Sequence, residues 1–212
     1  MTDDLERRLA GAAPRRALDI ERLRHEIAAR ADAAGLLDVA HATVDSPVGP
    51  LTVFVTRRGL LRLSYEDEPD DTQLDEIAAR VSPRILAAPE RTDDVRRQLD
   101  EYFAGARRGF DVPVDWRLVR GFAGAVLRAT ATIPFGGVST YRDVATEAGS
   151  PNAYRAAGNA LGSNPIPIVV PCHRVLHAGG GLGGYTGGLE RKRYLLTLEG
   201  VLSGNDPTPI GV

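Results

Sequence analysis

The stretch STYRDVATEAGSPNAYRAAGNALG, residues 139–162, contains two short segments of helical character separated by a turn. The first can be capped by Ser139 or Thr140 and ends at Gly149, because hydroxyl side chains cap helices and glycine ends them. The second follows Pro151, which is well placed in the first turn of a helix. Two short helices joined by a tight turn that contains glycine predict a helix-turn-helix, which decides the fold of the second half.

The second of these helices is built mostly from small residues, which are Ala153, Ala156, Ala157, Gly158 and Ala160. A helix that reads base edges in the major groove usually carries several Arg, Asn or Gln side chains, and only Arg155 and Asn159 could serve here. Small residues instead allow close approach, either to a DNA backbone and minor groove or to another part of the same domain. Both readings stay open, and a sequence-specific repressor is disfavoured.

The first half of the chain predicts a small α/β unit. Strands are expected within residues 38–66, where LTVFV (51–55) and LLRLSY (60–65) flank TRRG as a hairpin. The patterns at 71–81 and 92–105 predict helices that begin at Asp or Thr residues. The unit therefore combines a hairpin-containing sheet with two helices.

The regions around this unit are less regular. Residues 1–37 are expected to be helical up to Gly35, and their sequence does not decide between packing on the body, binding a partner and partial disorder. Pro113 predicts an extended linker over 110–116, and a further helix is expected over 120–133.

Charge is distributed unevenly, although the net charge is only −2. Residues 115–200 hold nine Arg and Lys against five Asp and Glu, so this half carries +4 and the remainder −6. Such a split indicates either that one half faces an anion or that solvated charge is simply uneven.

The chain has a single cysteine, which excludes an internal disulfide and a Cys-x-x-Cys metal site. A lone thiol favours a reducing compartment. The charged start MTDDLERRLA lacks the apolar core of a signal peptide, and no apolar run approaches the ~18 residues of a membrane span. We therefore expect a cytoplasmic protein with no membrane segment and no bound metal.

The cysteine, Cys172, lies within PIPIVVPCHRVLHAGGG, residues 165–181. The apolar run 168–170 is typical of a buried strand or extended core segment, and the surrounding prolines exclude a helix. A lone cysteine is most often a small buried hydrophobe. Here His173 and Arg174 follow at once, and a base and a cation beside a thiol lower its pKa. The segment thus predicts a reactive cysteine that favours the thiolate.

The geometry of a strand limits this prediction. Adjacent side chains of a straight strand point to opposite faces, so Cys172 and His173 cooperate only if the chain bends at Pro171 or if a water relays the proton. A histidine that acts as a base also needs a group that orients it. Glu199 is the best available carboxylate in the sequence.

The glycine-rich run GGGLGG, residues 179–184, satisfies the pattern G-x-G-x-x-G of dinucleotide sites. That motif should open a helix directly, whereas YTGG follows here and helical character begins only near Leu189. We therefore predict a glycine-rich loop or wing and no nucleotide cofactor.

The residues around Cys172 resemble the O6-alkylguanine-DNA alkyltransferases, also called methylated-DNA–protein-cysteine methyltransferases. The resemblance rests on PCHRV (171–175), GSNPIPIVV (162–170), GYTGGLERKRYLL (184–196), IPFGGVSTYRDVA (133–145), NAYRAAGNA (152–160) and QLDEYFAGARRGFDVPVD (98–115). It covers roughly residues 40–200.

The resemblance implies an α/β plus α fold. A small ribonuclease-H-like α/β domain would occupy 38–112, and a winged helix-turn-helix domain that carries the cysteine would occupy 113–202. Residues 1–37 form a helical extension outside the family pattern, and 203–212 a loose tail. The resemblance further implies a monomer that binds the minor groove of double-stranded DNA without sequence preference and flips out the damaged nucleotide.

Site residues are implied position by position. Cys172 would accept the alkyl group, His173 would take the thiol proton through a water, and Glu199 would orient His173. Tyr141 would press on the target phosphate and hydrogen-bond the leaving guanine. Asn164 would brace the turn between the DNA-binding helix and the cysteine.

The same resemblance implies contacts with DNA and with the flipped base. Arg155 would act as the finger that fills the vacated stack, within a DNA-binding set of Thr140, Tyr141, Arg155, Ala156 and Asn159. The substrate pocket would be formed by Val175, Tyr185, Thr186 and Lys192. The Val175 backbone would contact the guanine amine, and the Thr186 amide would face the guanine oxygen.

The sequence departs from the family pattern in two places near the DNA-binding helix. FAGAVL (122–127) lacks the Gln and Trp often found there, and Tyr154 replaces a smaller residue before the finger. The range of alkyl groups, and whether O4-alkylthymine is also repaired, stay open.

A thiolate suits attack on a methyl carbon, and the thioether product offers water no carbonyl, so each molecule should react once without any cofactor. Two other readings remain. A cysteine hydrolase built from Cys172, His173 and Glu199 would turn over, and a DNA-binding module would carry an inert or redox-sensing cysteine.

Overall fold

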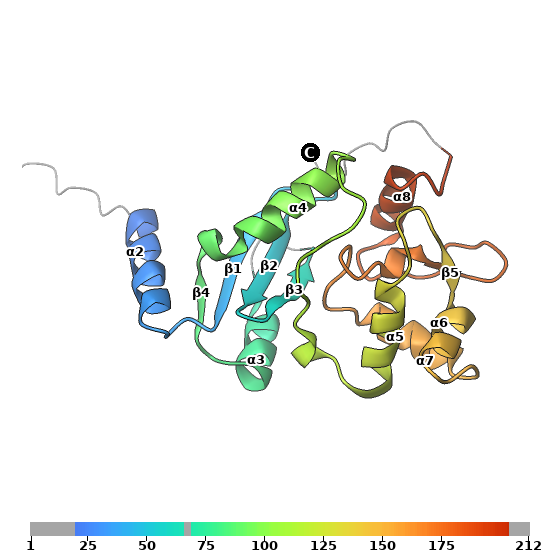
Figure 1. The fold of residues 1–212 in the computed structure, drawn as a ribbon, viewed down its shortest axis with the longest axis horizontal. Helices are drawn as coiled ribbons and strands as arrows, with labels where there is room; N and C mark the ends of the chain where they lie inside the picture. The colour runs from blue at the N-terminus through green and yellow to red at the C-terminus, as the bar shows by residue number, and fades with distance from the viewer. Residues whose placement is uncertain (1–19, 66–68, 204–212) are drawn as a thin grey trace, which may run out of the picture.

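The computed structural model describes residues 20–65 and 69–203 (Figure 1). Its helices are α2 (Ile20–Ala33), α3 (Asp71–Arg80), α4 (Asp93–Phe103), α5 (Gly121–Ala131), α6 (Tyr141–Glu147), α7 (Tyr154–Gly162) and α8 (Leu189–Leu198). Its strands are β1 (Val39–Val44), β2 (Leu51–Thr56), β3 (Gly59–Ser64), β4 (Ile85–Ala87), β5 (Ser139–Thr140) and β6 (Val175–Leu176). Short 3-10 helices are η1 (Pro89–Thr92), η2 (Trp116–Leu118) and η3 (Cys172–Arg174). Within these ranges, no helix has the length and apolar character needed to cross a bilayer.

The first half is built on a sheet with the strand order β3-β2-β1-β4. The predicted hairpin is confirmed as the antiparallel pair β2–β3, and β1 lies antiparallel to β2. Strand β2 is buried along its whole length because its side chains alternate between two cores. Val53 and Val55 belong to the core that includes Leu99 of α4, whereas Phe54 meets Ile77 of α3. The short parallel strand β4 was not predicted, since its three residues give too little periodicity.

The linker after α4 is extended, as Pro113 predicts, and it is also fixed to the edge of the sheet. Leu60 donates a backbone hydrogen bond of 2.8 Å to Pro113, and Asp115 donates one of 2.8 Å to Leu60. Gly59 permits this approach, because a Cβ there would lie 2.0 Å from the Pro113 carbonyl oxygen and the residue has a φ of +125°. The two halves are therefore joined by a chain segment that is held in place.

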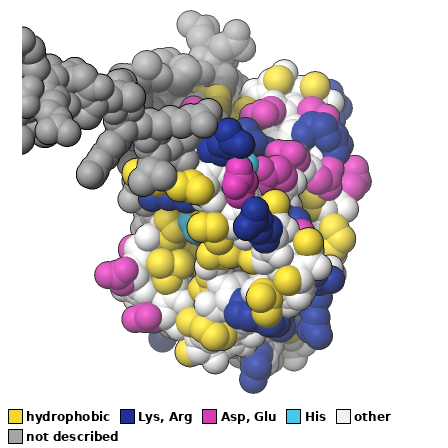
Figure 2. Space-filling view, turned by 90° about the vertical axis from the view of Figure 1, so that its left-hand side faces the viewer, with side chains coloured by type: hydrophobic (Ala, Val, Ile, Leu, Met, Phe, Trp, Pro, Cys, Tyr) yellow, Lys and Arg dark blue, Asp and Glu magenta, His cyan; other side chains and the backbone are white. Residues whose placement is uncertain are grey.

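Helix α2 carries the apolar stripe that predicts it, but the stripe faces outward. Ile20, Leu23 and Ile27 are exposed, whereas Ala28 on another face of the helix is 2% exposed and joins the core. Figure 2 shows this side of the molecule, where hydrophobic side chains lie among acidic and basic ones. The helix thus packs on the body through small residues, and the expectations for residues 1–19 and 204–212 lie outside the described ranges.

The second half contains the predicted pair of short helices, α6 and α7, which pack on each other and on α5. Thr140 caps α6 in a capping box with Asp143, which decides between the two predicted caps. The predicted start of the second helix is wrong: α7 begins at Tyr154, and Pro151 lies in the preceding turn. The glycine-rich run 179–184 forms a loop, as predicted.

The segment before the cysteine is buried but is not a strand, so that alternative of the prediction is wrong. Residues 165–170 form turns, and Ile168 has a φ of 71°. Closely spaced prolines remove the backbone donors that a strand needs, and they bend the chain instead. The bend leads into η3, so Cys172 and His173 lie on a helical turn rather than on opposite faces of a strand.

Candidate active site

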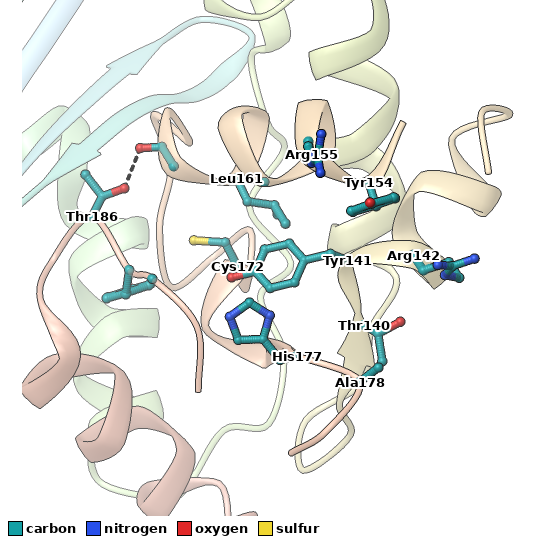
Figure 3. A pocket seen from close by; sticks show the side chains of 14 residues that line it. Thr140, Tyr141, Arg142, Tyr154, Arg155, Leu161, Cys172, His177, Ala178 and Thr186 are labelled. Atoms are coloured by element: carbon teal, nitrogen blue, oxygen red, sulfur yellow. Dashed lines mark hydrogen bonds between the residues drawn. The ribbon is translucent and has the colours of Figure 1, made fainter. Parts of the chain in front are cut away.

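Cys172 is the first residue of η3, and it lies at a cavity of about 760 Å³ (Figure 3). Cys172 as a whole is 5% exposed. The cavity is walled by α6, by α7 and by the loop that follows β6. In Figure 3 the ring of Tyr141 lies beside Cys172, with Leu161 and His177 close by. A nearly buried thiol therefore opens into a space between the two short helices and a glycine-rich loop.

Asn164 ties the thiol to the turn before it. Its Nδ2 donates to the carbonyl of Val170 at 2.8 Å and to Sγ of Cys172 at 3.2 Å. Its Oδ1 accepts a hydrogen bond of 3.0 Å from the backbone N–H of Ile166. The side chain is 8% exposed, so these bonds form away from most of the solvent. Asn164 consequently fixes both the path of the turn and the position of the sulfur.

Behind the cavity wall, Glu199 is the centre of a buried polar network. Its Oε1 lies 2.9 Å from Nε2 of His173 and accepts a hydrogen bond of 2.7 Å from the Tyr102 hydroxyl. Arg174 donates to both carboxylate oxygens at 2.8 Å. Burial raises the pKa of Glu199, but the hydrogen bonds from His173 and Arg174 outweigh it and lower the pKa to about 2. The carboxylate is therefore ionised at neutral pH.

Burial sets the protonation state of His173, and the Glu199 network sets which nitrogen carries its proton. Burial lowers the pKa of His173 below its ordinary value, despite the neighbouring carboxylate, so the imidazole is neutral at pH 7. Because the ionised Glu199 can only accept, Nε2 carries the proton. The other nitrogen, Nδ1, is buried and has no hydrogen-bond partner among the described residues. Nδ1 of His173, the residue that follows Cys172, is thus a basic nitrogen that can accept a proton.

The prediction that His173 and Arg174 lower the thiol pKa is wrong for the DNA-free protein. Burial raises the pKa of Cys172 to about 11, and the hydrogen bond from Asn164 and the charge of Lys192 only partly oppose this. The side chains of His173 and Arg174 interact with Glu199 instead. The resting cysteine is therefore a thiol, and a base must remove its proton when it reacts.

We expect the folded, DNA-free protein to react with iodoacetamide at a rate that rises about tenfold per pH unit from pH 7 to 10, because only the thiolate is nucleophilic. The unfolded protein should instead level off near the ordinary thiol pKa of 9.0. The measurement is the rate of mass increase, and Cys172→Ser controls for other sites. A plateau near pH 9 in the folded protein would contradict the assignment.

Lys192 and two tyrosines surround the rest of the site. Nζ of Lys192 donates to the Val175 carbonyl at 2.8 Å, and burial lowers the pKa of this lysine to about 8. The hydroxyls of Tyr65 and Tyr185 share a hydrogen bond. Tyr65 follows β3, so the sheet half contributes a side chain to the cysteine site.

The sequence prediction missed Tyr65 and Tyr102. Both come from the first half of the chain, in an α/β unit that carried no chemical motif. Tyr102 lies in the stretch QLDEYFAG, but its spacing marks it only as a core residue of a helix. Contacts that span 97 and 120 residues leave no local signal in a single sequence.

The predicted site residues fall into three groups in the structure. Those that line the cavity are Thr140, Tyr141, Arg155, Cys172, Tyr185 and Thr186. Those that are buried behind it are Asn164, His173, Val175, Lys192 and Glu199. Ala156 and Asn159 are exposed on α7 without lining the cavity. The structure thus gathers the predicted residues around one cavity, and their roles stay predictions.

Helix α7 divides its small residues between two surfaces. Ala157 and Ala160 are buried in the core, whereas Arg155, Ala156 and Asn159 face solvent. The packing reading is therefore confirmed for the inner face, whereas the DNA-contact reading of the outer face stays a prediction. The outer face leaves room for close approach of a large partner beside the cavity.

A cysteine at a cavity, with a buried neutral histidine next to it and a helix-turn-helix beside it, is the arrangement expected of a DNA-associated protein with a reactive thiol. Residues 39–116 match the model of the ribonuclease-like domain of 6-O-methylguanine DNA methyltransferase, and residues 121–201 match its DNA binding domain. The chain belongs to the 6-O-methylguanine DNA methyltransferase family, as the sequence resemblance predicts.

Individual relatives agree with this family. A methylated-DNA–protein-cysteine methyltransferase of Mycolicibacterium paratuberculosis is 43% identical over 164 residues, which cover 76% of this chain and 92% of that protein. The crystal structure of the Mycobacterium tuberculosis O6-methylguanine methyltransferase is similar with a TM-score of 0.62 and 40% identity, over 76% of this chain and 92% of that one. A structure of the same organism's OGT in complex with DNA has a TM-score of 0.63 at the same identity and coverage.

Proposed function

We propose that this protein repairs DNA by moving an alkyl group from O6 of guanine onto Sγ of Cys172. The observation that carries the proposal is a buried thiol that opens into a cavity between α6, α7 and a glycine-rich loop, with a neutral histidine behind it. Membership of the methyltransferase family supports the same reaction.

The proposed chemistry is one displacement. The proton of Cys172 passes through a water to Nδ1 of His173, and the resulting charge is stabilised by the ionised Glu199. The sulfur lone pair forms a bond to the alkyl carbon while the carbon–O6 bond breaks, and its electrons go to guanine. Tyr141, which lines the cavity, donates a proton or hydrogen bond to the leaving base. The thioether cannot be hydrolysed, so each molecule acts once.

Recognition of DNA would use the exposed face of the helix pair. Thr140, Arg155, Ala156 and Asn159 would contact the minor groove without sequence preference, and the flipped base would enter the cavity. We propose that Tyr185, Thr186 and the Val175 backbone contact that base, with Lys192 supporting the wall. The protein would act as a monomer, with domains at 38–112 and 113–202 between the extension 1–37 and the tail. Because its cysteine must stay reduced, we place it in the cytoplasm.

The test is to mix the protein with an excess of duplex that contains O6-methylguanine and to follow both partners by mass spectrometry. We expect one methyl group on the peptide that contains Cys172, and a burst limited to one repaired lesion per protein. Cys172→Ser, which keeps the size of the side chain, should give no transfer. Multiple turnover would support the hydrolase reading, and a methyl group on another residue would overturn the proposed acceptor.

A further inference from the structure

Tyr154 lies between two arginines at the mouth of the cavity. It is the first residue of α7, and the residue is 39% exposed. The guanidinium carbons of Arg142 and Arg155 lie 5.5 Å and 5.8 Å from the centre of its ring. In Figure 3 the two arginines lie on opposite sides of Tyr154, one from α6 and one from α7. The ring therefore links the N-terminal ends of α6 and α7 beside the cavity.

Both guanidinium groups contact the Tyr154 ring, and neither forms an ion pair with any residue that the structure describes. A guanidinium within about 6 Å of an aromatic centre is attracted to the ring face, even at an exposed site. A free arginine side chain would otherwise sample many rotamers and lose that freedom when it binds. Tyr154 thus reduces the disorder of two cations before any DNA arrives.

The position of the cluster of Arg142, Tyr154 and Arg155 indicates which ligand the two cations can bind. All three side chains line the cavity that contains Cys172, and the small exposed Ala156 follows on the same helix. Two cations that have no acidic partner among the described residues, on a face that permits close approach, suit the phosphates and the opened stack of a duplex.

We propose that Tyr154 is a positioning residue for duplex DNA, which acts through Arg155 and Arg142 and does not touch the reacting atoms. The inference rests on the proposed function and adds a residue to it. Loss of the ring leaves the thiol, His173 and Glu199 unchanged, so the reaction with a free O6-alkylguanine base needs nothing from Tyr154. Only the duplex reaction, in which the arginines must be in place, depends on it.

The experiment compares second-order rate constants for duplex O6-methylguanine and for free O6-benzylguanine base. Tyr154→Ala should slow the duplex reaction about fivefold, which corresponds to ~1 kcal/mol of lost cation–π contact, and leave the free-base rate within twofold. Tyr154→Phe keeps the ring and should restore the duplex rate. Tyr154→Leu has similar bulk without a π face and should behave as Tyr154→Ala does.

Further outcomes separate this inference from the proposed function. In an Arg155→Ala background, Tyr154→Ala should cost a clearly smaller factor, because one of its two partners is gone. Equal rates for wild type and Tyr154→Ala on duplex, equal loss on both substrates, or full activity of Tyr154→Leu would overturn the positioning role. A wild-type protein that takes neither the methyl group from the duplex nor the benzyl group from the free base would overturn the proposed function, and this inference with it. Equal thermal midpoints for all variants confirm that the comparison reports on recognition.

Discussion

Replacing Glu199 by alanine is expected to lower the free energy of unfolding by about 3–5 kcal/mol, the usual cost of removing one partner of a buried ion pair. Glu199 is 5% exposed and accepts hydrogen bonds from Arg174, His173 and Tyr102. Its loss leaves the guanidinium of Arg174 buried, with the Ile133 carbonyl as its remaining hydrogen-bond partner in the described residues. Urea unfolding followed by circular dichroism measures the change.

Two further variants serve as controls for the loss of stability, one in the first turn of α8 and one at Glu199 itself, which is the C-cap of that helix. Glu190→Ala removes an exposed carboxylate from the first turn of α8 and should change the unfolding free energy by less than about 0.5 kcal/mol. Glu199→Gln keeps the shape of the side chain and removes its charge, so we expect a smaller loss of stability than with alanine. Both Glu199 variants should slow methyl transfer, because Nε2 of His173 loses the carboxylate that fixes its proton. Full stability of Glu199→Ala would contradict the buried network.

The same network predicts how stability depends on pH. The pKa of Glu199 is depressed to about 2 from an ordinary 4.5, so its contribution is complete above pH 4.5 and is lost as the pH falls toward 2. The pKa of His173 is also depressed, below an ordinary 6.5, so protonation of the unfolded chain begins to reduce stability below that pH. In Glu199→Gln, the free energy of unfolding should fall less steeply between pH 4.5 and pH 2, because this carboxylate is no longer there to be protonated.

The sequence predicts elements best where the signal is local. The hairpin β2–β3 follows from two apolar runs around a turn, and α3 and α4 follow from helical spacing. The side chain of Asp70 caps α3, whereas Thr92 before α4 donates its hydroxyl to the Pro89 carbonyl and does not cap the helix. The start of α7 was missed by three residues, because Pro151 is equally compatible with the turn that precedes a helix. The apolar run 168–170 was ambiguous, since periodicity in three residues cannot separate a strand from buried turns.

The sequence predicted a reactive cysteine beside a histidine and a carboxylate, but it did not predict the direction in which the pKa of Cys172 is shifted. The neighbours of Cys172 in the chain are a base and a cation, and these side chains turn toward Glu199 once η3 forms. The pKa of the thiol then depends on burial, which is a property of the whole fold. Glu199 could be proposed by elimination, whereas Tyr102 and Tyr65 reach the site only through packing of the two halves.

Arg155→Ala is expected to slow methyl transfer from duplex DNA roughly ten- to a hundredfold, and to leave the reaction with free O6-benzylguanine within about twofold. A side chain that stacks where a base has left recovers ~1–3 kcal/mol of the cost of opening the duplex. Arg155 is exposed on α7 at the edge of the cavity, so it can reach the duplex while the base occupies the cavity. Single-turnover rates on both substrates measure the difference.

Charge and stacking can be separated by two further variants. Arg155→Lys keeps the positive charge without the planar guanidinium, so a stacking finger predicts a substantial loss and an unchanged salt dependence. Arg193→Ala removes an exposed cation of α8 that does not line the cavity, and it should leave the single-turnover rate unchanged.

A lesion that is easier to unstack gives the strictest test of the finger. Opposite a mismatched base, less energy is needed to flip the nucleotide, so Arg155→Ala should cost less there than in a fully paired duplex. Arg155 also lines the cavity, so a direct contact with the flipped base is the physical alternative. That alternative predicts equal losses on duplex and free base, and a loss that does not depend on the opposing base.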